Sequence, residues 1–134
     1  MILYSYILSY SSFFNNENLA EPTQVATSTK VITAAYEQFS VKQGKTNSKK
    51  FSIYNPDNTT NVTLTLNCID DNADNITFST GTNERNITIG VAQAKTFTLM
   101  FVVDRSVPTG DYICPIQVGS NVLNSEEFVI KVRN

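Results

Sequence analysis

The 134-residue chain is predicted to fold as an all-β protein, an antiparallel β-sandwich of seven or eight strands preceded by an extended N-terminal strand. From Ala34 onward, apolar side chains recur at every second position in short runs, and turn residues separate these runs at spacings of about 8–12 residues. No window holds a helical period over three turns. A period of two places successive side chains on opposite faces, so each run presents one apolar face. Facing sheets would then enclose a core about 10 Å thick.

The strands of the first half each end in a turn rich in Gly, Asn, Asp or Pro, as expected for short strands. Their apolar rows, in chain order, are Phe39 and Val41; Phe51 and Ile53; Val62, Leu64, Leu66 and Cys68; Ile76 and Phe78; and Ile87 and Ile89. The row from Val62 to Cys68 alternates with Asn and Thr, which is typical of a strand with one buried and one hydrated face.

The second half of the chain contains the longest rows. They are Phe97, Leu99, Phe101 and Val103; Tyr112, Cys114, Ile116 and Val118; and Phe128, Ile130 and Val132. The Pro-Thr-Gly turn at 108–110 separates the first two rows, and Lys131 and Arg133 alternate with the last row toward water. We therefore expect the sandwich to span residues 34–134.

Residues 1–14 form an uncharged strand signal of their own, and the polar segment 15–33 is predicted to be a linker. The alternating apolar row consists of Ile2, Tyr4, Tyr6, Leu8 and Tyr10. A secretory leader would need a positively charged start, but the first Lys is Lys30. The run is also too short and too rich in Ser and Tyr to span a membrane. We expect an extended strand that adds to a sheet, either in its own domain or in a neighbouring subunit, with a leader or a membrane contact as the competing interpretations.

Composition excludes several classes of function. The net charge is −2, and the Lys and Arg residues are scattered, so neither nucleic acid nor anionic lipid is an expected partner. The chain has no His, which is the usual general base near neutral pH and the commonest metal ligand. We find no motif for an enzyme and expect no cofactor. A charged fraction of only 16%, with abundant Asn, Thr and Ser, is typical of the outside of a cell or a virion.

The acidic segment Asp70–Asp74 places oxygen atoms at alternate positions, like the opening of a calcium-binding loop. The loop glycine is replaced by Asn75, and Gly81 stands where the closing Glu would be. We interpret the segment as an acidic turn between strands, with a weak calcium site as the alternative.

Several structural motifs carry a family resemblance. They are Val41–Gly44, Phe51–Pro56, Val62–Leu66, Thr96–Val103 and Val107–Tyr112, in this order. Residues 39–132 thereby resemble the immunoglobulin-like modules of archaeal and bacterial surface proteins, the CARDB-like group. The resemblance implies an immunoglobulin-like sandwich and an adhesive or structural role, and it does not cover the N-terminal strand.

In an immunoglobulin-like sandwich, Cys68 and Cys114 fall on inward rows that can approach each other, and the surface-protein resemblance favours a disulfide over two reduced cysteines. Four Asn-x-Ser/Thr sequons begin at Asn58, Asn61, Asn75 and Asn86, at turns, strand starts or a hydrated strand face. N-linked glycans are expected there if the protein is exported.

An N-terminal strand, a linker and a glycosylated sandwich are similar in plan to archaeal pili and thread-like filaments. We therefore predict a structural subunit of an extracellular filament, which polymerises head-to-tail when its N-terminal strand inserts into the next, identical subunit. One alternative is a virion structural protein whose arm is exchanged between subunits. Another is a monomeric adhesive or carbohydrate-binding domain whose arm completes its own sheet.

Overall fold

The computed structural model describes residues 30–134, so the N-terminal row Ile2, Tyr4, Tyr6, Leu8 and Tyr10 lies outside the described residues. The described part contains nine strands and one short 3-10 turn, η1 (Asp71–Asn75). The predicted all-β fold is therefore confirmed. None of the helical structure in residues 30–134 is long and apolar enough to cross a membrane.

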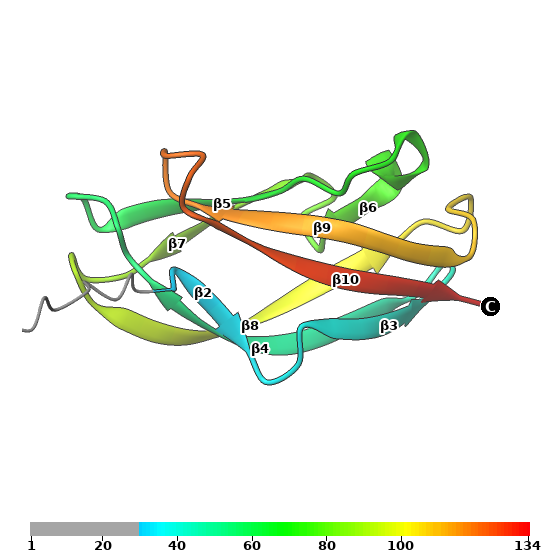
Figure 1. Cartoon of the computed structure of the whole chain (residues 1–134), viewed down its shortest axis with the longest axis horizontal. Coiled ribbons are helices and arrows are strands. Elements are labelled where there is room, and N and C mark those ends of the chain that lie inside the picture. The colour runs from blue at the N-terminus through cyan, green and yellow to red at the C-terminus, as the bar shows by residue number, and fades with distance from the viewer. Residues whose placement is uncertain (1–29) are drawn as a thin grey trace, which may run out of the picture.

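The strands form two sheets that pack face to face (Figure 1). The five-stranded sheet has the order β3 (Gln38–Lys42), β10 (Ser125–Arg133), β9 (Gly110–Val118), β5 (Asn61–Leu66) and β7 (Glu84–Thr88). The four-stranded sheet has the order β2 (Ile32–Ala34), β4 (Thr46–Tyr54), β8 (Ala94–Val103) and β6 (Ile76–Phe78). The consecutive strands β2 and β3 belong to different sheets, and each is the outer strand of its sheet.

The alternating apolar rows supply the core, as their period of two requires. In β9, for example, Tyr112, Cys114, Ile116 and Val118 are buried. Phenylalanine side chains join the two sheets at the centre. The rings of Phe51 and Phe128 meet edge to face with centroids 5.2 Å apart, and the centroids of Phe39 and Phe101 are 5.1 Å apart. Such pairs add to the stabilisation from burial alone.

Two features of the sandwich differ from the prediction. The strand β2 begins at Ile32, inside the segment assigned to the linker, because a three-residue strand is too short to show a period. The pairing of β3 with β10 is parallel, whereas an antiparallel sandwich was predicted. The chain changes sheets between β2 and β3 but keeps its direction. In the five-stranded sheet β3 then lies beside β10 and runs parallel to it.

The end of β4 is fixed by Asn55, a polar residue that is 0% exposed. Its Nδ2 donates to the carbonyl oxygens of Thr59 at 2.7 Å and Ile89 at 2.9 Å. Its Oδ1 accepts from the backbone N–H of Asp57 at 2.8 Å. Burial of an amide is costly unless its donors and acceptor are paired, and here both kinds are paired. The Asn-Pro sequence at this strand end therefore encodes a side-chain brace for the turn that follows.

Candidate functional site

The four-stranded sheet leaves part of β8 without a neighbouring strand on one side, as far as residues 30–134 are concerned. Along that side β6 pairs only with Phe101, Val102 and Val103, three of the ten residues of β8. The remaining stretch, Ala94–Met100, is paired with β4 on its other side. We call this stretch the β8 edge. An open strand edge presents a row of N–H and C=O groups to which another strand can bind.

The β8 edge is contacted by a charged side chain from the opposite sheet. Arg85 of β7 lies across from Leu64 of β5, and directly opposed residues of antiparallel strands point to the same face. Because Leu64 is buried, Arg85 also points toward the inside of the sandwich. Its Nη1 donates to the carbonyl oxygen of Thr98 at 3.0 Å. Inward-pointing charges are one way in which proteins protect strand edges.

The sequence prediction of a disulfide between Cys68 and Cys114 is confirmed, with the two Sγ atoms 2.05 Å apart. Both cysteines belong to the five-stranded sheet, since Cys114 lies in β9 and Cys68 follows β5. The chain still runs beside β9 there, because the Asn67 N–H donates to the Pro115 carbonyl at 2.9 Å. Regular pairing ends at Leu66 and Ile116, where Pro115 can donate no further ladder bond. The disulfide thus continues the junction of β5 and β9 beyond their hydrogen-bonded ladder.

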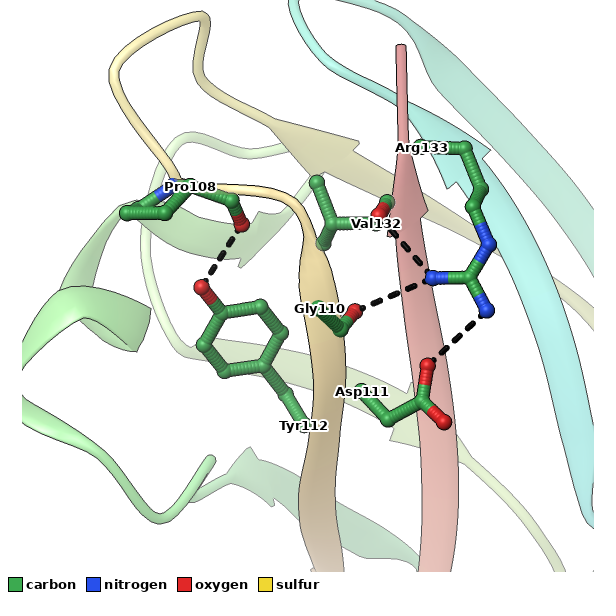
Figure 2. A network of polar contacts seen from close by, with 6 residues as sticks. All are labelled: Pro108, Gly110, Asp111, Tyr112, Val132 and Arg133. Carbon is green, nitrogen blue, oxygen red and sulfur yellow. Dashed lines mark hydrogen bonds and ion pairs between the residues drawn. The ribbon is translucent and has the colours of Figure 1, made fainter.

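The start of β9 is held by a polar network (Figure 2). The hydroxyl of Tyr112 donates to the carbonyl oxygen of Pro108 at 2.7 Å. Burial is the main cause that raises the pKa of this phenol above its usual value. A tyrosine two residues before a cysteine, bonded back to the preceding turn, is a hallmark of immunoglobulin folds.

On the exposed side of the same network, Arg133 of β10 binds β9 (Figure 2). Its Nη2 forms an ion pair with Asp111 Oδ1 at 2.9 Å, and its Nη1 donates to the Gly110 carbonyl at 3.4 Å. The ion pair is solvent-exposed, so its contribution to stability is small. The network braces the fold and offers no group poised for proton transfer.

The four sequon residues Asn58, Asn61, Asn75 and Asn86 are all exposed. Asn86 lies in β7 on the outer face of the five-stranded sheet, where its Oδ1 accepts from the Thr63 hydroxyl at 2.8 Å. This bond leaves the Asn86 Nδ2, the atom that would carry a glycan, outside the contact. A glycan at these positions is compatible with the buried core, and glycosylation stays a prediction.

The acidic segment Asp70–Asp74 forms a capped turn. Asp70 Oδ1 accepts from the backbone N–H of Asn72 at 2.8 Å and caps η1. Across residues 30–134, no three His, Cys, Asp or Glu side chains come together in a way that would hold a metal ion.

Another acid, Asp104, has a pKa held below its usual value, chiefly because its carboxylate accepts from the Ser106 hydroxyl and N–H. These two bonds measure 2.6 Å and 2.9 Å. Asp104 therefore organises the loop between β8 and β9.

An exposed apolar row crosses the outer face of the five-stranded sheet, and the sequence prediction missed it. Ile113 of β9 lies between Val129 of β10, its register partner, and Ile69, whose N–H donates to the Ile113 carbonyl at 2.8 Å. Ile69 is 62% exposed and the nearby Tyr36 is 77% exposed. The row was hidden in the sequence because Ile113 and Val129 alternate with longer buried rows in β9 and β10, while Ile69 and Tyr36 lie outside the strands.

No protein-family model and no curated protein sequence matches this chain. Among solved structures, the chain is similar to a family 123 glycoside hydrolase from Clostridium perfringens, with 15% sequence identity and a TM-score of 0.42. The similarity covers 71% of this chain and 22% of the hydrolase chain. The chain thus spans about a fifth of that structure, and a likeness at this level bears on neither substrate nor activity.

Proposed function

We propose that this protein is a structural subunit of an extracellular filament, in which the N-terminal strand of one subunit adds to the sandwich of the next. The observation that carries the proposal is the limited pairing of β8, which meets β6 over only three of its ten residues. The sequence supplies a segment suited to such an edge, since residues 1–14 are uncharged and carry an apolar or aromatic side chain at every second position from Ile2 to Tyr10.

Strand addition provides both affinity and register. Main-chain hydrogen bonds join the added strand to the edge, and alternate side chains enter the layer between the sheets. Each large apolar side chain that becomes buried stabilises the contact by roughly 1.5–3 kcal/mol, before the cost of ordering the strand. The contact is head-to-tail, so repetition extends a fibre when the rotation between subunits does not close a ring.

An extracellular setting is supported by three observations. The disulfide between Cys68 and Cys114 belongs to an oxidising environment. The four sequon residues are exposed, which leaves them accessible for modification. The surface has few charged residues and many hydroxyl and amide groups. A cell-surface filament fits these properties.

The proposal is tested by the size distribution of the purified protein, measured by sedimentation and by negative-stain imaging. The full chain is expected to form fibres, and a chain that lacks residues 1–14 is expected to remain a folded monomer. Tyr6→Asp should abolish fibres, because it places a charge in the row that becomes buried. Ser5→Asp is the matched control, since its side chain points to the opposite face of the same strand and fibres should persist.

Monomers from the full chain would contradict the proposal and would indicate that the arm completes its own sandwich. Normal fibres from the Tyr6→Asp variant would also contradict it, because the joint would then lie elsewhere.

A further inference from the structure

We infer that the site that accepts the N-terminal strand is the β8 edge, Ala94–Met100, and that Arg85 occupies this site until the strand of a second copy replaces it. The occupant is the segment Ile2–Tyr10 of another subunit. This inference rests on the proposed function, and it adds the location of the joint and the side chain that controls access to it.

The backbone of β8 directs its free groups toward the open side. The N–H of Val103 donates to the Lys45 carbonyl, so the odd-numbered residues of β8 bond toward β4. The even-numbered residues bond the other way, as shown by the Met100 carbonyl, which accepts from the Ser79 N–H at 3.0 Å. Backbone groups of Ala94, Thr96 and Thr98 therefore face the open side, where an added strand would bind them.

The side chains beside the β8 edge form an incompletely covered apolar surface. Leu99 is buried, whereas Phe97, two residues nearer the start of β8, is only partly buried. The Nζ of Lys95 lies 5.5 Å from the centroid of the Phe97 ring. Across the sandwich, Ile87 of β7 belongs to the buried core. An added strand would place alternate apolar side chains against Phe97, and so complete the burial of the ring.

Arg85 is placed to compete with strand addition. Its guanidinium donates to the Thr98 carbonyl, which is one of the groups that an added strand would need. A strand would replace this single bond with a series of main-chain bonds along Ala94–Thr98 and would release the charged side chain to water. The exchange is therefore favourable only for a partner that fills the whole edge, and short or mismatched strands are excluded.

The other edges of the sandwich are less suited to an apolar strand. The part of β4 that β2 does not cover, Thr46–Lys50, has no buried side chain, and Asn47 Nδ2 already donates to the Ser40 carbonyl of β3 at 2.6 Å. The edge of β3 carries Lys42, and the edge of β7 carries the sequon residue Asn86. Compared with the β4, β3 and β7 edges, the β8 edge alone combines free backbone groups with a partly buried aromatic ring.

Cysteine cross-linking locates the joint. Both native cysteines are engaged in the disulfide, so an introduced cysteine is the single free thiol of the chain. Ser5→Cys and Ser9→Cys place a thiol on the face of the N-terminal strand opposite its apolar row. Thr98→Cys places one on the exposed face of the β8 edge, and Ser40→Cys on the exposed face of β3 is the matched control.

Full-length single-cysteine chains are mixed in pairs and oxidised mildly. An arm cysteine is expected to cross-link to Thr98→Cys of another copy, with at least a tenfold lower yield to Ser40→Cys. Cross-linking to Ser40→Cys in preference, or fibres that show no cross-link at Thr98→Cys, would overturn the assigned site while leaving the filament intact. Absence of fibres from the unmodified chain would instead overturn the proposed function. A chain that carries both Ser5→Cys and Thr98→Cys is oxidised at low concentration as a further test. A cross-link within one chain would show that the N-terminal strand completes its own sandwich, and it would refute strand exchange between subunits.

Arg85→Ala tests the competing contact. Because the guanidinium no longer occupies the Thr98 carbonyl, the assembly rate should rise several-fold. Arg133→Ala is the control, since it also removes an arginine that donates to a backbone carbonyl, at the distant start of β9. Thermal unfolding of the truncated chain checks that both variants fold. An unchanged assembly rate for a folded Arg85→Ala variant would refute the role of Arg85.

Discussion

The side chain of Asn55 offers a quantitative test of how the sandwich is held together. Replacement by Ala removes two donated bonds and one accepted bond at the end of β4. The bond to the Ile89 carbonyl is buried, and those that involve Thr59 and Asp57 are partly buried. An unpaired buried group costs about 1–3 kcal/mol, and each lost bond at a partly wet site costs about 0.5–1.5 kcal/mol. The expected loss in the free energy of unfolding is therefore about 2–6 kcal/mol.

Asn55→Asp sharpens this prediction, because a carboxylate would face the carbonyl oxygens of Thr59 and Ile89 without a proton to donate. Burial and these two oxygens should raise the pKa of the new carboxyl in the folded state above its unfolded value. A raised pKa means that the folded state binds the proton more tightly than the unfolded state does. The destabilisation should then be greatest at neutral pH and should decrease as pH falls through the raised folded pKa.

The assay is urea unfolding of the chain that lacks residues 1–14, so that assembly does not interfere, at neutral and mildly acidic pH. Asn58→Ala, an exposed asparagine in the same turn, is the control and should change stability by less than about 0.5 kcal/mol. A loss for Asn55→Ala as small as that of the control would refute the assignment of Asn55 as a buried brace. So would an Asn55→Asp variant that is as stable at neutral pH as in acid.

Three further predictions concern the same sandwich. Loss of the disulfide in a double Cys68→Ala, Cys114→Ala variant should lower the free energy of unfolding by about 4 kcal/mol, because the cysteines are 46 residues apart in the sequence. Urea unfolding with and without reductant measures this loss. A wild-type protein whose stability does not change with reductant would contradict the bond. Tyr112→Phe removes the bond to the Pro108 carbonyl and should cost about 1 kcal/mol, while Tyr36→Phe, at an exposed site, should cost nothing measurable. The folded pKa of Asp104 is depressed, so the stabilisation that Asp104 provides is present above its unfolded pKa and is lost as pH falls through its folded pKa. Ser106→Ala should weaken this dependence of the free energy of unfolding on acid pH. An unchanged pH dependence of stability would argue against the Ser106 contact.

The apolar rows of the long strands were predictable because burial of one face imposes a strict period of two. Leu64 and Leu99 illustrate this, since each occupies the inward position that the alternation assigns to it. Phe97 was expected on the same inward row as Leu99 but is only partly buried. The difference arises from its place beside the β8 edge, where no described strand covers the ring.

The pairing partners of the strands were not predictable by the same reasoning. Periodicity indicates which face of a strand is buried, but it does not indicate which strand lies next to it. The parallel pairing of β3 with β10 and the short pairing of β6 with β8 both depend on where the chain changes sheets. These pairings are determined by tertiary packing, so no local sequence pattern predicts them.

The candidate site depended on this hidden information. A single arginine between two polar residues of β7 carries no sequence signal, and the role of Arg85 emerges only when β7 and β8 are placed on opposite sheets. The disulfide was accessible from the sequence, because Cys68 and Cys114 both fall on inward rows and only two cysteines are present. The N-terminal strand stays a prediction, and the sequence does not indicate which edge would receive it.

Amide hydrogen exchange along β8 tests the central claim most directly. The backbone N–H groups of Thr96 and Thr98 face the open side of the sheet, so they should exchange rapidly in the chain that lacks residues 1–14. In assembled full-length protein the added strand should bind them, and their exchange should slow by orders of magnitude, while the exposed edge of β3 stays unprotected. Rapid exchange of Thr96 and Thr98 in fully assembled fibres would contradict strand addition at β8.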